Sequence, residues 1–342
     1  MVTVLRYILF PVSLIYGGIT FVRNKLYDWG VLKSSSFDVK TILLGNLSAG
    51  GTGKTPHIEY LIRLLSEEYR LATLSRGYGR KTQGFVLANT HSTASDIGDE
   101  PLQFFQKFEQ VKVAVSAKRV TGIMELMIQE DPEVILLDDA FQHRQLKAGL
   151  SILLMDFNAP FYKDFMLPTG YLREFASGKK RADIILVTKC PQGLSQKEKD
   201  TIRMRINAES IPIYFSTIVY GKPVSLFGSS SELLDQSKRI LVVTGIANPA
   251  PLHNHMATWK KEITSLTYPD HHPFSPKDVN RIIGVYNQYP DTVILTTEKD
   301  AMRLKDLNEL EELPVFYLPI EVKLVEEEDK FSHLIHNYVR NN

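Results

Sequence analysis

Residues 42–56 read ILLGNLSAGGTGKTP: an apolar run, a loop rich in glycine, and the start of a helical pattern. This order is typical of a phosphate-binding loop, in which successive backbone N–H groups and a helix N-terminus face the anion. Lys54 would reach the β- and γ-phosphates, and the Thr55 hydroxyl would ligate Mg²⁺. Ser48 stands where the usual pattern has its first glycine, but the other features still predict a nucleoside triphosphate site. The candidate nucleotide-binding residues are Gly50, Gly51, Thr52, Gly53, Lys54 and Thr55.

The composition is that of an ordinary folded protein with enough residues for two domains. The chain has 342 residues, of which 44% are hydrophobic and 23% charged, and its 40 basic and 39 acidic side chains give a net charge of +1. This balance provides no basic field for nucleic acid, so no nucleic-acid partner is expected. Cys190 is the single cysteine, which excludes an internal disulfide or a thiolate metal cluster and suits a reducing cytosol. We interpret Cys190 as a packed small residue rather than a nucleophile.

Residues 4–22, VLRYILFPVSLIYGGITFV, form an apolar segment close to the ~20 residues that span a bilayer. Arg6, Pro11 and the Gly17-Gly18 pair disfavour a clean spanning helix, and no cleavage site of a signal peptide closes the segment. An interfacial helix is the preferred interpretation, with its apolar side in lipid and basic side chains among the head groups. A helix that packs into the protein core is the alternative. Residues 1–35 are therefore predicted to be membrane-associated, with the membrane surface as a partner.

Apolar, β-branched runs alternate with segments of helical period along the rest of the chain. The predicted strands are 41–44, 71–74, 111–115, 134–137, 152–155 and 184–187, and the predicted helices include 56–67, 101–106 and 118–129. Continuous apolar strands separated by helices predict an α/β fold, a P-loop NTPase-type parallel sheet with helices on both faces. After residue 211 the pattern restarts, with strands expected at 240–244, 263–268, 292–296 and 315–318.

These patterns divide the chain into five parts. They are an N-terminal membrane-associated helical segment (1–35), a P-loop core (36–211), an extended linker (212–225), a smaller α/β domain (226–322) and a C-terminal helix that packs back on the core (323–342). Parallel sheets bind ligands at the carboxyl ends of their strands. The phosphate loop and the polar residues that follow other strands are therefore expected on one edge of the sheet.

Residues 134–139, VILLDD, are an apolar strand that ends in two acids. In phosphate-loop proteins an acid at this place holds Mg²⁺ against the β- and γ-oxygens, so Asp138 and Asp139 are predicted metal residues; a solvated turn is the alternative. Gln142 and His143 follow and place polar donors beside the same site. Arg76 lies between a strand and two glycines, where it suits bidentate phosphate recognition or belongs to a surface turn.

Other polar clusters are candidates for acid–base chemistry. Asp99 precedes a helix and by itself is typical of a cap or first-turn acid. Residues 270–272, Asp-His-His, contain a histidine that, paired with a carboxylate, would make a good general base toward a hydroxyl. His253 and His255 have a metal-binding spacing but no evident third ligand, so we interpret them as surface histidines. Residues 297–300, TEKD, face a cleft or form an ion-paired turn.

The combination resembles the tetraacyldisaccharide 4′-kinases, the lipid A 4′-kinases of Gram-negative bacteria. The matching segments, in family order, are GN at 45–46, GGTGKTP at 50–56, SRGYG at 75–79, GDEP at 98–101, DDAFQHR at 138–144, LRE at 172–174, RAD at 181–183, GIANP at 245–249, DHH at 270–272 and TEKD at 297–300. Ser48 is also usual in the family. Tyr171 and Phe175 stand where the family commonly has proline, which affects local loop geometry and not the chemistry.

The resemblance implies an ATP-dependent kinase that sits, peripheral or monotopic, on the cytoplasmic face of the bacterial inner membrane. It would phosphorylate the 4′-hydroxyl of a tetraacylated glucosamine disaccharide 1-phosphate to give lipid IVA, using Mg²⁺ and no obligate protein partner. The family's catalytic acid–histidine pair falls on Asp99 and His271, with His272 as a neighbour that could take the same place. Its phosphate and Mg²⁺ residues fall on Lys54, Thr55, Asp138 and Asp139, with Gln142, His143 and Glu174 nearby.

Two other functions stay open on the sequence alone. A GTPase or ATPase that assembles metal centres would read guanine with an Asn-Lys-x-Asp motif, but Thr188 replaces the asparagine and Pro191 the aspartate. A non-catalytic nucleotide-binding membrane scaffold would make the Asp99 and His271 clusters incidental. If Asp99 and His271 lie on different domains, the kinase interpretation predicts that they meet only when a cleft closes.

Overall fold

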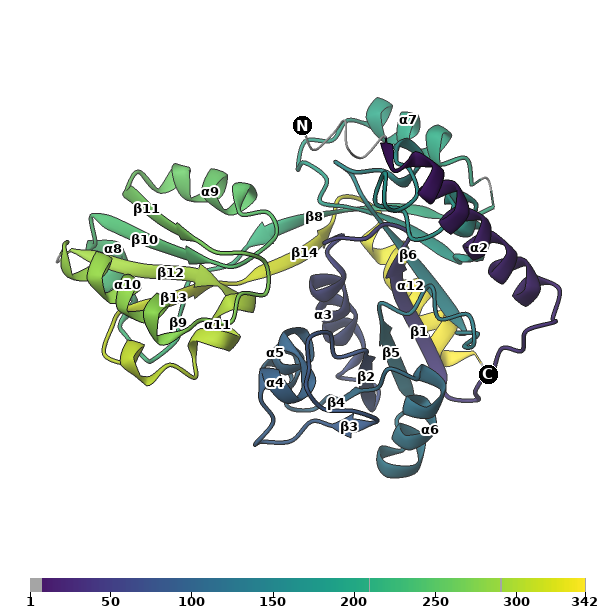
Figure 1. The fold of residues 1–342 in the computed structure, drawn as a ribbon, viewed down its shortest axis with the longest axis horizontal. Coiled ribbons are helices and arrows are strands. Elements are labelled where there is room, and N and C mark those ends of the chain that lie inside the picture. Colours follow the sequence, from purple (N-terminus) through teal and green to yellow (C-terminus); the bar gives the residue numbers. More distant parts are fainter. Residues whose placement is uncertain (1–7, 209, 290, 342) are drawn as a thin grey trace.

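The protein consists of two α/β lobes joined by a pair of strands (Figure 1). The computed structural model describes residues 8–208, 210–289 and 291–341. The larger lobe is built on a nine-stranded sheet of order β14-β8-β7-β6-β1-β5-β2-β4-β3, in which the edge strands β14 and β3 are antiparallel to their neighbours and the other seven are parallel. The predicted α/β fold with a large parallel sheet is confirmed. Its strands are β1 (Lys40–Asn46), β2 (Leu71–Ser75), β3 (Val86–Leu87), β4 (Lys112–Val115), β5 (Val134–Asp138), β6 (Leu150–Asp156), β7 (Ile184–Thr188), β8 (Ile213–Tyr220) and β14 (Ile320–Leu324).

Alternate residues of each central strand enter two separate cores, because successive side chains of a strand point to opposite faces. Ile42 and Leu44 of β1 pack with one set of helices, whereas Leu43 packs with the other. The first core contains α3 (Lys54–Leu65), α5 (Asp99–Lys107) and α12 (Glu328–Arg340), and the second contains α6 (Arg119–Glu130) and α7 (Gln196–Ile206). The short helices α4 (Ala94–Ile97), η1 (Phe161–Lys163) and η2 (Ala176–Arg181) complete the lobe.

The smaller lobe has a five-stranded sheet of order β11-β10-β12-β13-β9. Its strands are β9 (Val224–Ser225), β10 (Arg239–Thr244), β11 (Glu262–Thr267), β12 (Thr292–Thr297) and β13 (Val315–Leu318). Its helices are α8 (Ser231–Gln236), α9 (Ala250–Met256), η3 (Ala257–Trp259), α10 (Pro276–Asn287), α11 (Glu298–Leu304) and η4 (Asn308–Leu310). Helix α11 packs against α5 of the larger lobe, where Ala301 and Met302 share a small apolar core with Ile97 and Leu102.

The connection between the lobes differs from the predicted linker at 212–225. Residues 213–220 are extended as expected, but they form β8, which pairs with β7 and β14 inside the large sheet. Residues 320–322 belong to β14 of that sheet and not to the smaller lobe. The reason is that the partner of β8 lies about a hundred residues downstream, so local sequence cannot distinguish a connector from a paired strand. Helix α12 lies against the first core of the larger lobe through Phe331, Ile335 and Val339.

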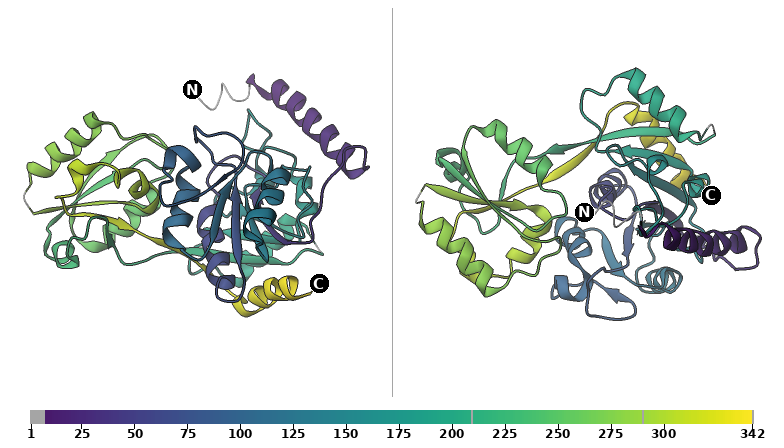
Figure 2. Two further views of the ribbon diagram at one scale, coloured as in Figure 1. Left: turned by 90° about the horizontal axis from the view of Figure 1, so that it is seen from below. Right: turned by 45° about the horizontal axis from the view of Figure 1, so that its top comes forward.

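Helix α2 (Phe10–Asp28) lies along the outside of the larger lobe, on the opposite side from α12 (Figure 2). It docks by a narrow face of small residues, where the Ser13 hydroxyl donates to Thr169 Oγ1 at 2.7 Å and Gly17 is buried. Its other faces expose seven large apolar side chains, and Ile8 and Leu9 just before the helix are exposed as well. The seven are Phe10, Val12, Leu14, Ile15, Ile19, Phe21 and Val22. The helix is therefore not a core helix, and residues 4–7 of the predicted apolar segment lie outside the described residues. Within the described residues, no helix has the length and apolar character needed to cross a bilayer.

Candidate active site

A cleft of about 1290 Å³ opens where the carboxyl ends of the large sheet's strands face the smaller lobe. Its walls include the phosphate loop, the ends of β2 and β5, and residues of the smaller lobe such as Asn248, His271 and Lys299. Most of the polar segments that the sequence singled out therefore meet in one cavity. Parallel sheets bind ligands at this edge, since loops and helix N-termini gather there.

The phosphate loop has the geometry that an anion requires. Gly50 and Gly53 adopt φ values of 121° and 86°, which a side chain would disfavour, and Gly53 caps the N-terminus of α3. Lys54 is the first residue of α3, and its Nζ lies 3.6 Å from Asp139 Oδ1 and 3.5 Å from Asn46 Oδ1. The ammonium is thus held at the strand ends, beside the free N–H groups of the helix N-terminus.

The two acids at the end of β5 have different surroundings. Asp139 is held by cations, because Arg173 Nη1 donates to both of its carboxylate oxygens at 3.0 Å and Lys54 lies nearby. Burial acts to raise the pKa of Asp139, but Lys54 and Arg173 outweigh it and lower the pKa. Asp138 is buried, and its Oδ1 has no hydrogen-bond partner. Burial and the nearby Glu100 raise the pKa of Asp138 to about 7.

The remaining predicted nucleotide residues divide into two groups. Arg76, Gln142 and His143 line the cleft, and burial lowers the pKa of His143. Glu174 does not line the cleft. It is buried behind Gln142, which donates to it at 3.0 Å, and it also accepts from Arg181 and from Asn24 of α2 at 2.8 Å each. Its position connects the site to the N-terminal helix.

Asp99 and His271 come from different lobes and are in contact. Asp99 is the first residue of α5, and His271 lies in a turn after β11 with φ of 57°. His271 Nδ1 is 2.9 Å from Asp99 Oδ2. Arg303 Nε lies 3.5 Å from the same oxygen. Burial acts to raise the pKa of Asp99, but the bond to His271 and the charge of Arg303 outweigh it and lower the pKa.

Two further basic residues line this cleft: Lys299, whose place the sequence left open between a cleft and a turn, and Arg119, which sequence reasoning missed. Lys299 Nζ is 2.9 Å from His271 Nε2, and it is also near Glu100 and Asp270 at 3.7 and 3.8 Å. Arg119 is buried under β5, where it donates to the carbonyl of Asp138 at 3.0 Å. The TEKD pattern did indicate the first as a cleft residue or turn, whereas Arg119 stands in an ordinary helical segment that carries no such signal.

Three other residues that the sequence singled out take no part in the chemistry of the site, although Cys190 touches the cleft wall. His253 and His255 lie on α9 rather than on a strand, and His255 stacks on Tyr220 with ring centroids 4.2 Å apart. Cys190 is buried, and burial raises the pKa of its thiol to about 12, as a packed residue requires. Within the described ranges, no cluster of three His, Cys, Asp or Glu side chains is arranged to hold a metal ion.

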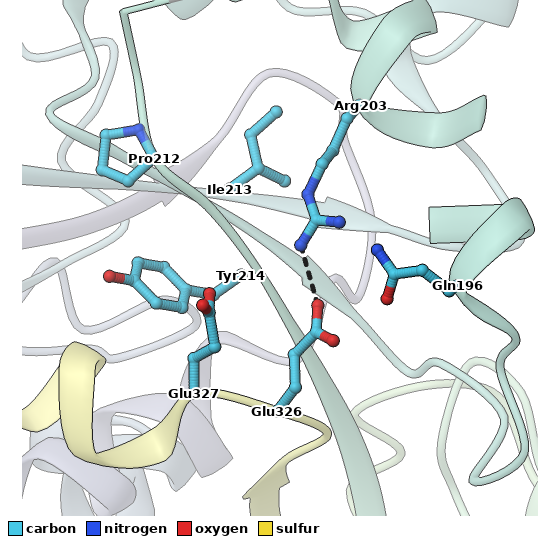
Figure 3. Close-up of a pocket in the computed structure, with 7 residues that line it drawn as sticks. All are labelled: Gln196, Arg203, Pro212, Ile213, Tyr214, Glu326 and Glu327. Carbon is cyan, nitrogen blue, oxygen red and sulfur yellow. Dashed lines mark hydrogen bonds and ion pairs between the residues drawn. The ribbon is translucent and has the colours of Figure 1, made fainter. Parts of the chain in front are cut away.

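A second hollow of about 490 Å³ lies between α7, β8 and the start of α12 (Figure 3). Its charged side chains satisfy one another, since Arg203 Nη2 donates to Glu326 Oε1 at 2.7 Å, as Figure 3 shows, and Lys199 donates to Glu326 Oε2 at 2.7 Å. These contacts fasten the segment just before the C-terminal helix to α7. The hollow is structural and contributes nothing to the cleft.

Comparisons with known proteins agree on one family. The profile of the tetraacyldisaccharide-1-P 4′-kinases matches residues 5–340. A tetraacyldisaccharide 4′-kinase of Flavobacterium johnsoniae is 48% identical over 99% of this chain and 98% of its own length, and one of Bacteroides thetaiotaomicron is 46% identical over 98% and 93%. The solved structure of LpxK from Aquifex aeolicus in complex with ATP has a TM-score of 0.77 at 29% identity, covering 98% of this chain and 99% of that one. The chain belongs to the tetraacyldisaccharide-1-P 4′-kinase family.

Proposed function

We propose that this protein transfers the γ-phosphate of ATP to the 4′-hydroxyl of a tetraacylated glucosamine disaccharide 1-phosphate, giving lipid IVA. The observation that carries the proposal is the 2.9 Å contact of Asp99 with His271, which lines the same cleft as the phosphate loop. Named relatives along the whole chain are tetraacyldisaccharide 4′-kinases, and a structural relative was solved with ATP. A lipid disaccharide is thus the acceptor, and ATP is the donor.

The donor half of the site consists of the loop 50–55 with Lys54, Arg76 and Arg173. Phosphoryl transfer depends mainly on positioning and on neutralising charge that spreads over the phosphate oxygens. Lys54 and Arg173 already flank Asp139 at the strand ends, and Arg76 lines the same wall. Gln142 bonds the carbonyl of Asn46 at 2.8 Å and so holds the base of the loop against β5.

The residues present fit a Mg²⁺ ion. Asp138 Oδ1 is buried without a partner, and a carboxylate oxygen left in this way is the hard ligand that Mg²⁺ prefers. Asp138 and the Thr55 hydroxyl would hold the ion, whereas Asp139 is already held by Lys54 and Arg173 and serves to position them. When bound, the ion neutralises charge on the β- and γ-phosphates.

His271 acts as the base toward the 4′-hydroxyl. A carboxylate only accepts hydrogen bonds, so the nitrogen that faces Asp99 carries the proton and Nε2 has the free electron pair. The Lys299 ammonium now donates to Nε2, and the incoming hydroxyl must take its place. Nε2 then accepts the hydroxyl proton as the oxygen bonds to the γ-phosphorus, while the bond from that phosphorus to the β,γ-bridging oxygen breaks and ADP leaves.

The exposed apolar faces of α2 support a membrane-bound location. Ile15 and Ile19 are 66% and 64% exposed on the outer side of the helix, and Arg23, Lys25 and Lys33 follow them in the chain. An apolar helix with basic residues at its end is suited to the interface of an anionic bilayer. On the cytoplasmic face of the inner membrane, the substrate's acyl chains would stay in the bilayer while its sugar reaches the cleft.

Transfer of labelled phosphate tests the function. The full chain is incubated with γ-labelled ATP, Mg²⁺ and the disaccharide 1-phosphate in detergent, and the lipid fraction is counted. We expect label in the lipid with wild type, and a loss of ~10²-fold or more with Asp99→Asn and His271→Gln while ATP binding survives. ATP that is bound but never transferred would support the scaffold, and GTP preferred over ATP would support the GTPase.

Vesicle binding tests the membrane location. The double variant Ile15→Glu/Ile19→Glu should sediment much less with vesicles of phosphatidylethanolamine and phosphatidylglycerol than wild type, because two charges enter the apolar face. Met204→Glu is the matched control, since Met204 is 78% exposed on α7 of the same lobe. Equal sedimentation of all three proteins would show that α2 does not hold the chain on the membrane.

A further inference from the structure

Three consecutive carbonyls of the phosphate loop each meet a side-chain donor. Lys189 Nζ contacts the carbonyl of Gly51, Thr188 Oγ1 donates to that of Thr52 at 2.8 Å, and His57 Nδ1 lies 2.6 Å from that of Gly53. The C=O and the following N–H of a peptide unit point in opposite directions. A donor that holds the carbonyl of Gly53 therefore aims the N–H of Lys54 at the other side of the loop, where a phosphate binds.

His57 makes a second contact that the other two donors lack. It is 2% exposed on α3, and its Nε2 lies 2.8 Å from the hydroxyl of Ser216 on β8. The Gly53 carbonyl can only accept, so Nδ1 carries the ring proton and Nε2 accepts from Ser216. Burial lowers the pKa of His57 to about 4, so the ring is neutral at physiological pH. Both ring nitrogens are thus committed, one to the loop and one to the strand.

Strand β8 connects this contact to the smaller lobe. Ser216 pairs with Leu324 of β14, and these two strands are the link between the lobes. At the far end of β8, Tyr220 stacks on His255 of α9. A shift of the loop that moves the Gly53 carbonyl would therefore also move the strand pair β8–β14. The smaller lobe, which contains His271, is attached to that pair.

We propose that His57 is a positioning residue that, through Ser216, couples occupancy of the phosphate loop by ATP to the strand pair β8–β14. This inference rests on the proposed use of ATP as donor. We call the chain of contacts from the Gly53 carbonyl through His57 to Ser216 the relay. Coupling of this kind is reciprocal, so ATP should lower the local opening of the strand pair, and loss of the relay should weaken ATP binding. A histidine that only filled space would show neither effect.

Hydrogen exchange with and without ATP tests the relay in the full chain. In wild type we expect ATP to slow exchange both at residues 50–58 and at residues 213–220. In Ser216→Ala the protection at 50–58 should remain, while that at 213–220 falls to less than half. The KM for ATP should rise about 5-fold, the factor that one buried hydrogen bond contributes, with kcat changed less.

The matched control is Thr41→Val. Thr41 is buried on β1 at the opposite end of the sheet, where its hydroxyl accepts from Gly149 N–H at 2.9 Å, so this variant loses one buried hydrogen bond far from the loop. It should keep both the protection at 213–220 and the KM for ATP.

His57→Phe keeps a ring but no nitrogen. Combining it with Ser216→Ala should raise the KM for ATP no further than His57→Phe alone, since both substitutions break the same chain of hydrogen bonds.

Protection at 213–220 that survives in Ser216→Ala, or that is lost equally in Thr41→Val, would overturn the relay. Absence of ATP protection at 50–58 in wild type would contradict ATP binding itself, and with it the proposed function on which the relay rests. The two failures are therefore distinguishable in one experiment.

Discussion

At the scale of residues, His271 and His272 are neighbours with opposite surroundings. His271 has a positive φ and turns toward Asp99 of the larger lobe. His272 stacks on Tyr268 with ring centroids 4.7 Å apart, and its Nε2 lies 3.1 Å from Asp278 Oδ2. The sequence could not distinguish the two histidines, because the carboxylate that His271 meets lies 172 residues away in the chain.

Substitutions of the two histidines should differ in their effect on kcat. We expect His271→Gln to lower kcat by ~10²-fold or more, because it removes the base, and His272→Gln to keep kcat within about 3-fold of wild type. His272→Gln should instead lower the melting temperature, since a ring that packs on Tyr268 is lost. Steady-state transfer assays and thermal unfolding of both variants check this, and a reversed order of the two kcat values would move the base to His272.

At the scale of elements, the docking of α2 depends on two adjacent glycines with different roles. A Cβ on Gly17 would lie 2.8 Å from the ring of Phe175, whereas a Cβ on Gly18 would have no neighbour within 4 Å. Gly17 therefore allows the helix to approach the loop after η1, and Gly18 is exposed. A helical pattern in the sequence contains both glycines and shows no difference between them.

Substitution of either glycine by leucine should raise helix propensity equally, but only Gly17→Leu should displace α2. Overpacking of a close contact costs about 1–3 kcal/mol, so proteolysis in the connection at residues 29–36 should become about 10-fold faster or more. Gly18→Leu should be cleaved at the wild-type rate. Equal cleavage of the two variants would mean that α2 is not held by this contact.

Helix α10 begins with a capping box in which the Ser275 hydroxyl and N–H both donate to Asp278. These bonds, with a smaller contribution from His272, lower the pKa of Asp278 from 3.8 to about 2. A carboxyl whose folded pKa is lowered stabilises the protein above its unfolded pKa, and that stabilisation is lost as the pH falls.

The contribution of Asp278 to the free energy of unfolding should therefore change with pH within one range. Wild type should exceed Asp278→Asn by about 1 kcal/mol above pH 4, the usual value of a helix cap, and the difference should shrink between pH 4 and pH 2. Urea unfolding at pH 5, 4 and 3 checks the trend. A difference that is the same at pH 3 and pH 5 would contradict the assigned cause.

At the scale of the whole molecule, the lobes are held together by a cluster of buried charge beside the cleft. Lys107 of α5 bonds Glu59 of α3 at 2.7 Å and Glu298 of α11 at 2.6 Å. Burial acts to lower the pKa of Lys107, but the two carboxylates outweigh it and raise the pKa. Helix α5 thus makes three charged contacts between the lobes: Asp99–His271, Glu100–Lys299 and Lys107–Glu298.

Removal of the central cation should loosen the two lobes. Lys107→Met leaves the buried Glu298 carboxylate without its cation, whereas Glu59 keeps Arg63 and Gln103. Breaking a buried ion pair in this way costs about 3–5 kcal/mol of unfolding free energy. Lys112→Met breaks an exposed pair with Glu130 and should cost ~1 kcal/mol or less. Urea unfolding measures both, and solution scattering should show a larger radius of gyration for Lys107→Met alone. Similar costs for the two variants would mean that the cluster does not hold the lobes.

The contact between Asp99 and His271 also bears on closure. The kinase interpretation of the sequence expects these residues to meet only when the cleft closes, and in this structure they are already 2.9 Å apart. The reacting pair is therefore in contact in this arrangement of the lobes, and Lys299 Nζ lies 2.9 Å from the other ring nitrogen of His271. The packing of α11 against α5 therefore brings Asp99 and His271 together.

Local sequence determined the strands, the phosphate loop and the polar residues at the strand ends, because apolar periodicity and glycine-rich turns act over a few residues. Only the tertiary structure decided that β8 joins the large sheet, that Glu174 lies behind the site, that Arg119 supports Asp138, and that His271 rather than His272 meets Asp99. Each of these depends on partners that lie between 19 and 172 residues away in the chain. Such pairings are set by the packing of whole elements, which no local pattern contains.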